Sequence, residues 1–378
     1  MPDLSVIQTA LNRAVTDGVF PGAVLAVRCG DRPVARFHAG RLSISPPGPP
    51  VSDSTIYDLA SLTKPLATAT SIALLIQRGD LQLEDTVAEH LQECAETSIG
   101  SATLRDLLTH SSGLPGWRPF YERIDPEGKI PSSEKARDRA KQAMLKSITA
   151  EAPVYERGAR SLYSDLGFML LGMIVERCSR QDLDHFFYGY ITIPLDGLRI
   201  EYVLRERLNE FLAWANRDGG VAPTEIDPWR QGHLLCGEVH DQNAAALGGE
   251  AGHAGLFGNA DAVLAITGEW LHACHGRKAI LDHEIAREFT RRQKQEGASS
   301  WALGWDTPST PSSAGRYFDA RSFGHLGYTG TSVWIDPVRE LEVVLLSNRV
   351  HPSSKNEAIR EFRPVIHDLV FQEFIGSI

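Results

Sequence analysis

Ser61 and Lys64 are the residues of this chain whose types and spacing most directly indicate chemistry. They stand three positions apart in the stretch Tyr57-Asp-Leu-Ala-Ser-Leu-Thr-Lys-Pro-Leu-Ala67. Side chains three residues apart lie on the same face of a helix, so the Lys64 amine would be within reach of the Ser61 hydroxyl proton. A serine whose proton passes to a neighbouring base becomes a nucleophile that attacks a carbonyl carbon and forms an acyl-enzyme.

A buried helix is predicted directly after this pair. The apolar run 66–76 ends at Gly79, a residue suited to the position after a helix. Pro65 is tolerated in the first helical turn, where its missing N–H costs no hydrogen bond. Ser61 would then lie at the helix N-terminus, where the helix dipole favours nearby negative charge. A plain helix N-cap is the alternative interpretation, because the same Ser-x-x-Lys spacing recurs at 132–135 in a polar segment.

Two further stretches, taken with the first, resemble the motifs of a known family. Tyr163-Ser-Asp165 comes directly before an apolar helix predicted at 166–178, and Gly324-His-Leu-Gly-Tyr-Thr-Gly330 comes before a predicted strand. In this order the three stretches resemble the Ser-x-x-Lys, Tyr-x-Asn and Lys-Thr-Gly or His-x-Gly motifs of the serine β-lactamase and penicillin-binding-protein family. The likeness is greatest to its class C β-lactamase and esterase-like branch. Framework segments along nearly the whole chain are also similar to that family: 20–24, 79–85, 107–115 and 252–257.

The resemblance implies a role for each matching residue. Ser61 would be the acylated nucleophile, Lys64 the amine that accepts its proton, and Tyr163 a phenolic relay that protonates the leaving group or activates water. The backbone N–H groups of Ser61 and Tyr328 would form an oxyanion hole, and such donors are worth several kcal/mol in acyl transfer. The remaining matched positions are expected to bind substrate: Asp165, His325 and Gly327.

Two of these positions differ from the family's pattern. His325 stands where β-lactamases usually have a lysine that attracts the substrate carboxylate, and a histidine is only partly charged near pH 7. If His325 contributes to binding, activity should depend on a group that titrates near ~6.5. Asp165 replaces an asparagine that can donate to a substrate amide, whereas a carboxylate only accepts and favours the protonated form of Lys64. Both changes argue against an efficient β-lactamase and fit an esterase or a peptidase of different specificity.

The order of predicted elements indicates an α/β fold of the α+β type. Elements from the two ends of the chain are a helix at 4–16, a β-hairpin of strands at 23–28 and 34–39, strands at 317–323, 332–335 and 341–347, and a helix at 359–374. Other helices are predicted at 104–109, 166–178, 262–272 and 285–295. We therefore expect an antiparallel sheet built from both termini and flanked by helices, with an inserted, mostly helical lobe. The expected domains are 1–60 with 235–378 for the sheet and 61–234 for the helices, with the active site at their junction.

Composition restricts the partners and the compartment. A formal net charge of −10 and scattered basic residues argue against nucleic acid or an anionic membrane surface as a partner. The five cysteines are far apart, so neither a disulfide framework nor a zinc site is indicated. The chain begins without a signal-peptide pattern and has no apolar run long enough to cross a bilayer. A cytoplasmic location is expected unless a leader has been removed, and the oligomeric state is left open.

No cofactor and no metal ion is expected. His240, Asp241 and His253 lie in a Gly-rich loop and lack ligand spacing, so a structural role is favoured for them. The same interpretation applies to three further titratable residues: His110, His233 and Glu250.

The sequence predicts a serine hydrolase that works through an acyl-enzyme on carboxylic esters, amides or lactams. Its partner would be a small-molecule substrate of one of these classes. D-alanyl-D-alanine carboxypeptidase and weak β-lactamase are alternatives within the same family. An alternative from a different class is a non-catalytic ligand-binding or scaffold protein on the same fold, against which the intact Ser61, Lys64 and Tyr163 speak.

Overall fold

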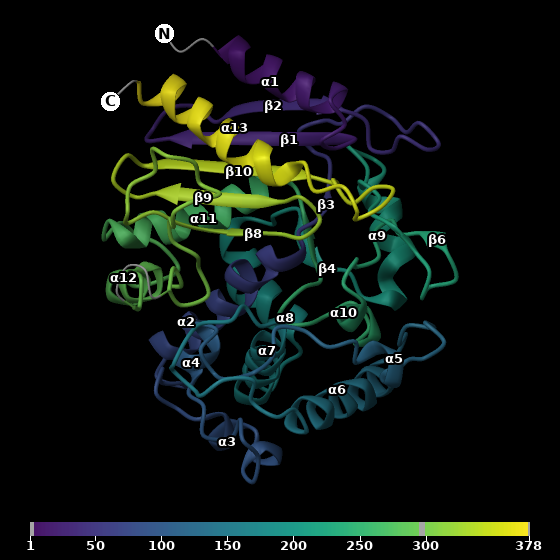
Figure 1. Cartoon of the computed structure of the whole chain (residues 1–378), viewed down its shortest axis with the longest axis vertical. Helices are drawn as coiled ribbons and strands as arrows, with labels where there is room; N and C mark the ends of the chain where they lie inside the picture. Colours follow the sequence, from purple (N-terminus) through teal and green to yellow (C-terminus); the bar gives the residue numbers. More distant parts are fainter. Residues whose placement is uncertain (1–3, 295–298, 377–378) are drawn as a thin grey trace.

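A five-stranded antiparallel sheet forms the upper half of the molecule in Figure 1. Its strands are β1 (Gly22–Cys29), β2 (Ala35–Gly40), β8 (Phe323–Leu326), β9 (Ser332–Asp336) and β10 (Leu341–Ser347). In this computed structural model, which describes residues 4–294 and 299–376, they lie in the order β2-β1-β10-β9-β8. The N-terminal hairpin therefore pairs with the last strand of the chain, and each neighbouring pair is antiparallel.

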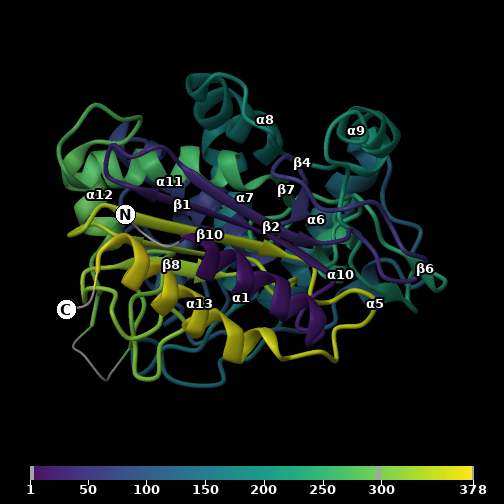
Figure 2. The same cartoon turned by 90° about the horizontal axis from the view of Figure 1, so that it is seen from above.

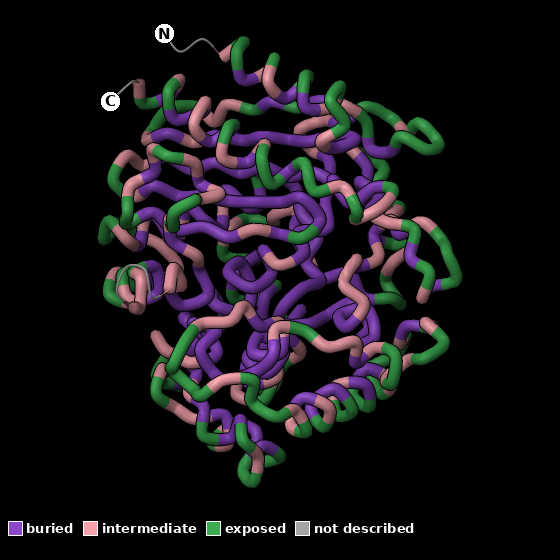
Figure 3. The backbone as a smooth tube through the Cα atoms, viewed as in Figure 1, coloured by how far each residue is buried: buried purple, intermediate pink, exposed green. Residues whose placement is uncertain are grey.

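The two faces of this sheet pack into different hydrophobic cores. Successive side chains of a strand point to opposite faces, so Leu25 packs with α1 (Leu4–Thr16) and α13 (Ile359–Phe374), while Val24 faces the larger core. Figure 2 shows α1 and α13 side by side on one face of the sheet and α11 (Ala260–Cys274) on the other. The sheet is thus covered on both sides, and its central strands β1 and β10 are buried along almost their whole length (Figure 3).

Helices fill the lower half of Figure 1 and share the larger core with the inner face of the sheet. The apolar helix predicted at 166–178 is α7 (Asp165–Ser179), which contacts α2 (Thr70–Gln77) directly. The other helices are α3 (Val87–His90), α4 (Leu104–Leu108), α5 (Tyr121–Ile124), α6 (Glu134–Thr149), α8 (Leu183–Phe187), α9 (Leu208–Ala215), α10 (Gln242–Ala246) and α12 (His283–Thr290).

A small three-stranded sheet brings a distant loop next to the Ser61 stretch. In it β3 (Tyr57–Asp58) pairs with β7 (Leu256–Gly258), which also pairs with β4 (Ile200–Tyr202). Ser61 follows β3 closely and His253 precedes β7 closely, so antiparallel pairing of the two strands brings these residues together. The remaining strands form a short ribbon: β5 (Ile226–Asp227) and β6 (His233–Leu234).

The predicted fold class is confirmed, but two predicted boundaries are wrong. The strand predicted at 317–323 begins only at Phe323, because a turn precedes it in which the Asp319 carboxylate accepts from the Arg321 N–H. The helix predicted at 285–295 ends at Thr290, and Gln295 lies outside the described residues.

Two other expectations concern the domain division and membrane-spanning segments. The division into 1–60 with 235–378 and 61–234 remains a prediction. Among the helices of residues 4–294 and 299–376, none has the length and apolar character needed to cross a membrane.

Candidate active site

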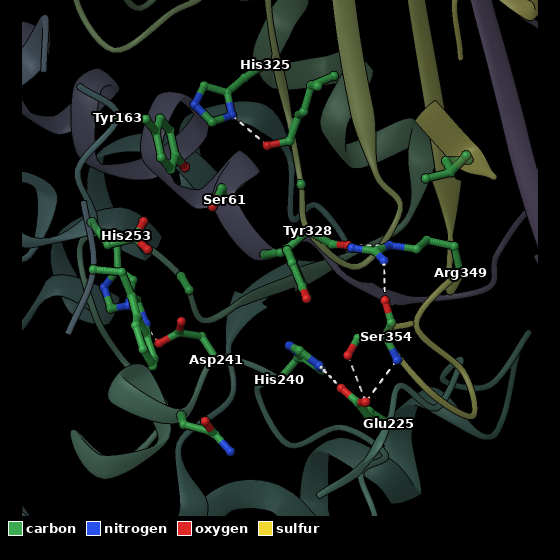
Figure 4. Close-up of a pocket in the computed structure, with 18 of the residues that line it drawn as sticks. Ser61, Tyr163, Glu225, His240, Asp241, His253, His325, Tyr328, Arg349 and Ser354 are labelled. Carbon is green, nitrogen blue, oxygen red and sulfur yellow. Dashed lines mark hydrogen bonds and ion pairs between the residues drawn. The ribbon is translucent and has the colours of Figure 1, made fainter. Parts of the chain in front are cut away.

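A cavity of about 980 Å³ lies between β8 and the helical part of the molecule. It brings together residues that are far apart in the sequence, and Figure 4 shows Ser61 between the side chains of Tyr163 and Tyr328. Lys64 is fully buried beside Ser61. Six of the predicted site residues line the cavity: Ser61, Tyr163, Asp165, His325, Gly327 and Tyr328.

The backbone around Ser61 is held in an unusual conformation. Ala60 has a φ of 48°, a left-handed value that is uncommon for a residue with a Cβ and is often found at functional sites. The buried Asp58 carboxylate stabilises it by accepting from the Ala60 N–H at 2.8 Å. Ser61 then lies in a 3₁₀ turn, and a π-helical turn (Lys64–Ala69) with Pro65 at its start leads into α2. Ser61 is therefore held at the beginning of the predicted helix, and the π-helical segment separates it from the regular helix that starts at Thr70.

Lys64 binds three acceptors with its ammonium group. Its Nζ donates to Ser61 Oγ at 2.9 Å and to the His253 carbonyl at 3.2 Å, and it forms an ion pair with Asp165 Oδ1 at 2.6 Å. Burial lowers the pKa of Lys64, but the contacts with Asp165 and Tyr163 together outweigh burial, so the pKa lies above the usual value. Lys64 is therefore charged at neutral pH, as expected from the carboxylate at position 165.

Tyr163 completes a hydrogen-bonded group with Ser61 and Lys64. Side-chain hydrogen bonds connect its hydroxyl to both residues, and burial raises its pKa, so the phenol is neutral at pH 7. The ring is fixed by aromatic neighbours, with ring centroids 4.7 Å from His110 and 5.5 Å from Trp301. His110, expected to be structural, thus helps to position Tyr163.

The turn after β8 is fastened to the backbone that precedes Ser61. The hydroxyl of Thr329 donates to the Asp58 carbonyl at 2.7 Å, and the hydroxyl of Thr331 donates to the Leu59 carbonyl at 3.0 Å. Within the described part of the chain, neither the Ser61 N–H nor the Tyr328 N–H donates to a protein acceptor. Two unpaired N–H donors at the same cavity are the feature that an oxyanion hole requires.

His325 is buried in the wall of the cavity and is uncharged. Its Nδ1 lies 2.8 Å from the Leu326 carbonyl, which makes Nδ1 the protonated nitrogen and leaves Nε2 without a protein partner. Burial, together with the nearby Lys64 charge, lowers its pKa to about 3. The expectation that His325 is partly charged near pH 7 is therefore wrong, because a sequence does not show how deeply a side chain is desolvated.

Replacing His325 by glutamine is expected to leave the shape of the pH–rate profile unchanged between roughly pH 5 and 8. With a pKa of about 3, the imidazole is already neutral throughout this range and releases no proton in it. The measurement is kcat/KM of a neutral ester at half-unit pH intervals for both proteins. A limb near pH ~6.5 that is present in the wild type and lost in His325→Gln would contradict this assignment.

The Gly-rich loop before β7 contributes more than the sequence indicated. The backbone carbonyl of His253 accepts from Lys64, and the side-chain Nε2 of His253 lies 2.8 Å from Asp241 Oδ1. Next to them, the His240 Nε2 lies 2.9 Å from Glu225 Oε2 (Figure 4). Burial raises the pKa of Asp241, but His253, the hydrogen bond from the Ala244 N–H and the Lys64 charge together hold that pKa below its usual range. The sequence signal was a stretch, 216–260, that is rich in Gly, Ala and His and has little periodicity.

One group of side chains in the described part of the chain has ligand atoms close enough to share a metal ion. It consists of Asp182, Asp184 and His185, whose ligand atoms lie within 4.8 Å of one another. None of them lines the cavity. Acidic groups at a surface are common without a metal, so this group has no assigned role.

The chain belongs to the Beta-lactamase family, which matches residues 7–364. Among curated proteins, it is 32% identical over 320 residues to a protein of Escherichia coli K12 named "Putative D-alanyl-D-alanine carboxypeptidase", covering 79% of this chain and 70% of that one. A protein of the same name from Salmonella typhi is 30% identical over 326 residues, with 81% and 72% covered.

Solved structures of similar fold come from proteins of different names. EstCE1, described as a hydrolase with promiscuous acyltransferase activity, has a TM-score of 0.72 at 20% identity and covers 95% of this chain and 98% of its own. The simvastatin synthase LovD of Aspergillus terreus, in its LovD6 mutant form, has a TM-score of 0.74 at 19% identity, with 99% and 98% covered. The octameric penicillin-binding protein homologue of Pyrococcus abyssi has a TM-score of 0.73 at 20% identity, with 99% and 78% covered. These likenesses show the fold.

The prediction of a serine hydrolase of the β-lactamase-like family is confirmed by these relationships. The roles assigned to Ser61, Lys64, Tyr163 and the other site residues remain predictions, which the geometry above supports.

Proposed function

We propose that this protein hydrolyses small carboxylic esters, and amides more slowly, through an acyl-enzyme on Ser61. The observation on which this proposal rests is the contact of 2.9 Å between Lys64 Nζ and Ser61 Oγ at the wall of an open cavity. Tyr163 and Asp165 also contact the Lys64 amine, so the Ser61 hydroxyl belongs to a network that can accept and return its proton.

The charge states of the network define its working form. At rest Lys64 is an ammonium and Tyr163 a neutral phenol, so one proton must leave this group for solvent before Ser61 can attack. As the bond from Ser61 Oγ to the substrate carbonyl carbon forms, the hydroxyl proton moves to the vacated position on Lys64 or Tyr163. That proton passes to the leaving oxygen or nitrogen when its bond to carbon breaks. Water then attacks the acyl carbon with the reverse proton movement and regenerates Ser61.

The cavity wall favours uncharged acyl groups over lactams that bear a carboxylate. The neutral His325 supplies no positive charge at the position where β-lactamases usually have a lysine. Asp165 cannot donate to a substrate amide because it is an acceptor paired with Lys64. The names of the curated relatives favour D-alanyl-D-alanine carboxypeptidase activity as the second candidate. In that case Arg360, an exposed arginine of the cavity lining that is paired with Glu357 at 2.8 Å, is a candidate to bind the terminal carboxylate.

Incubation with a fluorophosphonate is expected to add one adduct per chain, located at Ser61 by peptide mapping. Ser61→Ala should abolish the adduct, because the reagent needs the activated hydroxyl. Ser132→Ala is the matched control, since Ser132 starts the second Ser-x-x-Lys sequence but lies in an exposed segment. Adduct formation that continues in Ser61→Ala would refute the proposal. Turnover of a p-nitrophenyl ester, a D-alanyl-D-alanine peptide and nitrocefin then separates the candidate activities.

Replacing Asp165 by asparagine is expected to shift the alkaline rise of the acylation rate to lower pH. The Asp165 carboxylate raises the pKa of Lys64, so its removal lowers that pKa and the deprotonated network forms more readily. The amide can also donate to a substrate amide, which should reduce the preference for the ester over nitrocefin by roughly 10–100-fold. The measurement is kcat/KM for both substrates between roughly pH 6 and 10. An unchanged ratio together with an unchanged profile would show that Asp165 has neither effect.

A further inference from the structure

The orientation of the Tyr328 N–H is set by the carbonyl on the other side of the same peptide unit. In a trans peptide the C=O and the following N–H point in opposite directions, and the Gly327–Tyr328 bond is not among the cis bonds. The group that binds the Gly327 carbonyl therefore fixes the direction of the Tyr328 N–H. That carbonyl accepts from Arg363 Nη2 at 3.0 Å and from the Gly330 N–H at 3.2 Å.

Arg363 closes the turn from the side of the C-terminal helix. The same Nη2 also donates to the Thr331 carbonyl at 2.9 Å, and Thr331 in turn accepts from the Gly327 N–H at 2.7 Å. One guanidinium thus holds both ends of the turn, Gly327 and Thr331, which contains Tyr328. A flexible ammonium group lacks the planar, preorganised donors that make such a double contact geometrically specific.

Arg363 is buried without an anionic partner, and burying a charge costs free energy. The residue is 6% exposed, and its Nε has no protein partner. No carboxylate in the described part of the chain forms an ion pair with it, and its charged neighbours are Arg349 and Arg360. Burial, with a smaller contribution from these arginines, lowers its pKa to about 9, so it is still charged at neutral pH. An unpaired buried cation is rare in proteins, and its location directly behind the turn calls for a functional explanation.

We propose that Arg363 is the positioning residue of the oxyanion hole. It holds the Gly327 carbonyl so that the Tyr328 N–H points away from it, toward the place where the substrate carbonyl oxygen lies over Ser61. Its positive charge also polarises this peptide unit and strengthens the N–H as a donor. The inference rests on the proposed function, because it presupposes acyl transfer at Ser61. Arg349 differs in that it donates to the Tyr328 carbonyl, which belongs to the next peptide unit.

The test is Arg363→Ala with and without guanidinium chloride at a low, non-denaturing concentration. The arginine lines the cavity, so free guanidinium can occupy the vacated space. We expect kcat for a p-nitrophenyl ester to fall about 100-fold with little change in KM, because the donor acts mainly in the transition state. Guanidinium, but not sodium chloride at equal ionic strength, should raise the kcat of Arg363→Ala at least about tenfold in a saturable manner. It should leave the kcat of the wild type unchanged.

Controls separate positioning from a general weakening of the fold. Arg316→Ala removes another contact to α13, the ion pair with Asp368, without touching the turn, so its kcat should equal that of the wild type. Arg363→Lys keeps the charge and should lose less kcat than Arg363→Ala, which provides a second variant if the alanine protein does not fold. A wild-type kcat in either folded Arg363 variant, or a loss that guanidinium does not relieve, would overturn the inference. If the wild type itself shows no adduct at Ser61, the proposed function fails as well.

Discussion

Replacing Lys64 by methionine is expected to slow acylation of Ser61 by about 10³–10⁴-fold. Lys64 is the amine in direct contact with the Ser61 hydroxyl, at 2.9 Å, and methionine has a similar length without a group that can bind a proton. Tyr163 alone cannot replace it, because burial raises the pKa of the phenol and makes its deprotonated form scarce at neutral pH. The rate is measured in a single turnover with excess fluorophosphonate, which isolates acylation from later steps.

A control is needed because the substitution also leaves Asp165 without its ionic partner. The ion pair between Lys64 and Asp165 is largely shielded from solvent, and an unpaired buried carboxylate destabilises a fold. The double variant Lys64→Met/Asp165→Asn removes both charges and should regain thermal stability without regaining acylation. An acylation rate of either variant within tenfold of the wild type would show that Lys64 is not the proton acceptor.

Replacing Gly327 by alanine is expected to reduce kcat by about 10²–10³-fold. A Cβ at this position would lie 1.9 Å from Thr331 Oγ1 and 2.7 Å from the Leu59 carbonyl, and atoms cannot approach so closely. The Thr331 hydroxyl must then give up its bond to Leu59, and the turn moves away from the Ser61 backbone. The Tyr328 N–H moves with it, so the proposed oxyanion hole loses one donor.

The matched control for this glycine is Gly189→Ala, because nothing lies within 4 Å of a Cβ built at Gly189 and no positive φ is recorded for it. Its kcat and melting temperature should stay close to those of the wild type. For Gly327→Ala, steady-state kcat and KM are compared with circular dichroism of the folded protein. A folded Gly327→Ala protein with full kcat would exclude the turn from catalysis.

Local sequence was sufficient for the features that depend on short-range geometry. The spacing of Ser61 and Lys64 predicted that they lie on one side of a helix start, and in the structure Lys64 Nζ lies 2.9 Å from Ser61 Oγ. The hairpin predicted at 23–28 and 34–39 is present as β1 and β2, because two short runs of strand-forming residues with a Gly-Asp turn between them define such a pair. Pro65 lies in the first turn, as its missing N–H requires. A strand was predicted where the turn at 319–322 lies. In this turn the Asp319 side chain accepts from the Arg321 N–H, in place of a strand hydrogen bond.

The state of the site depends on contacts between distant parts of the chain, which only the tertiary structure decided. His325 is neutral since several elements bury it together, and no neighbour in sequence shows this. His253 reaches Lys64 through the pairing of β3 with β7, across 189 residues of chain. Arg363 reaches the Gly327 carbonyl because α13 packs against the sheet. Desolvation and hydrogen-bond direction are properties of the folded surroundings of a group, so residue types and spacing name the participants but not their charge or orientation.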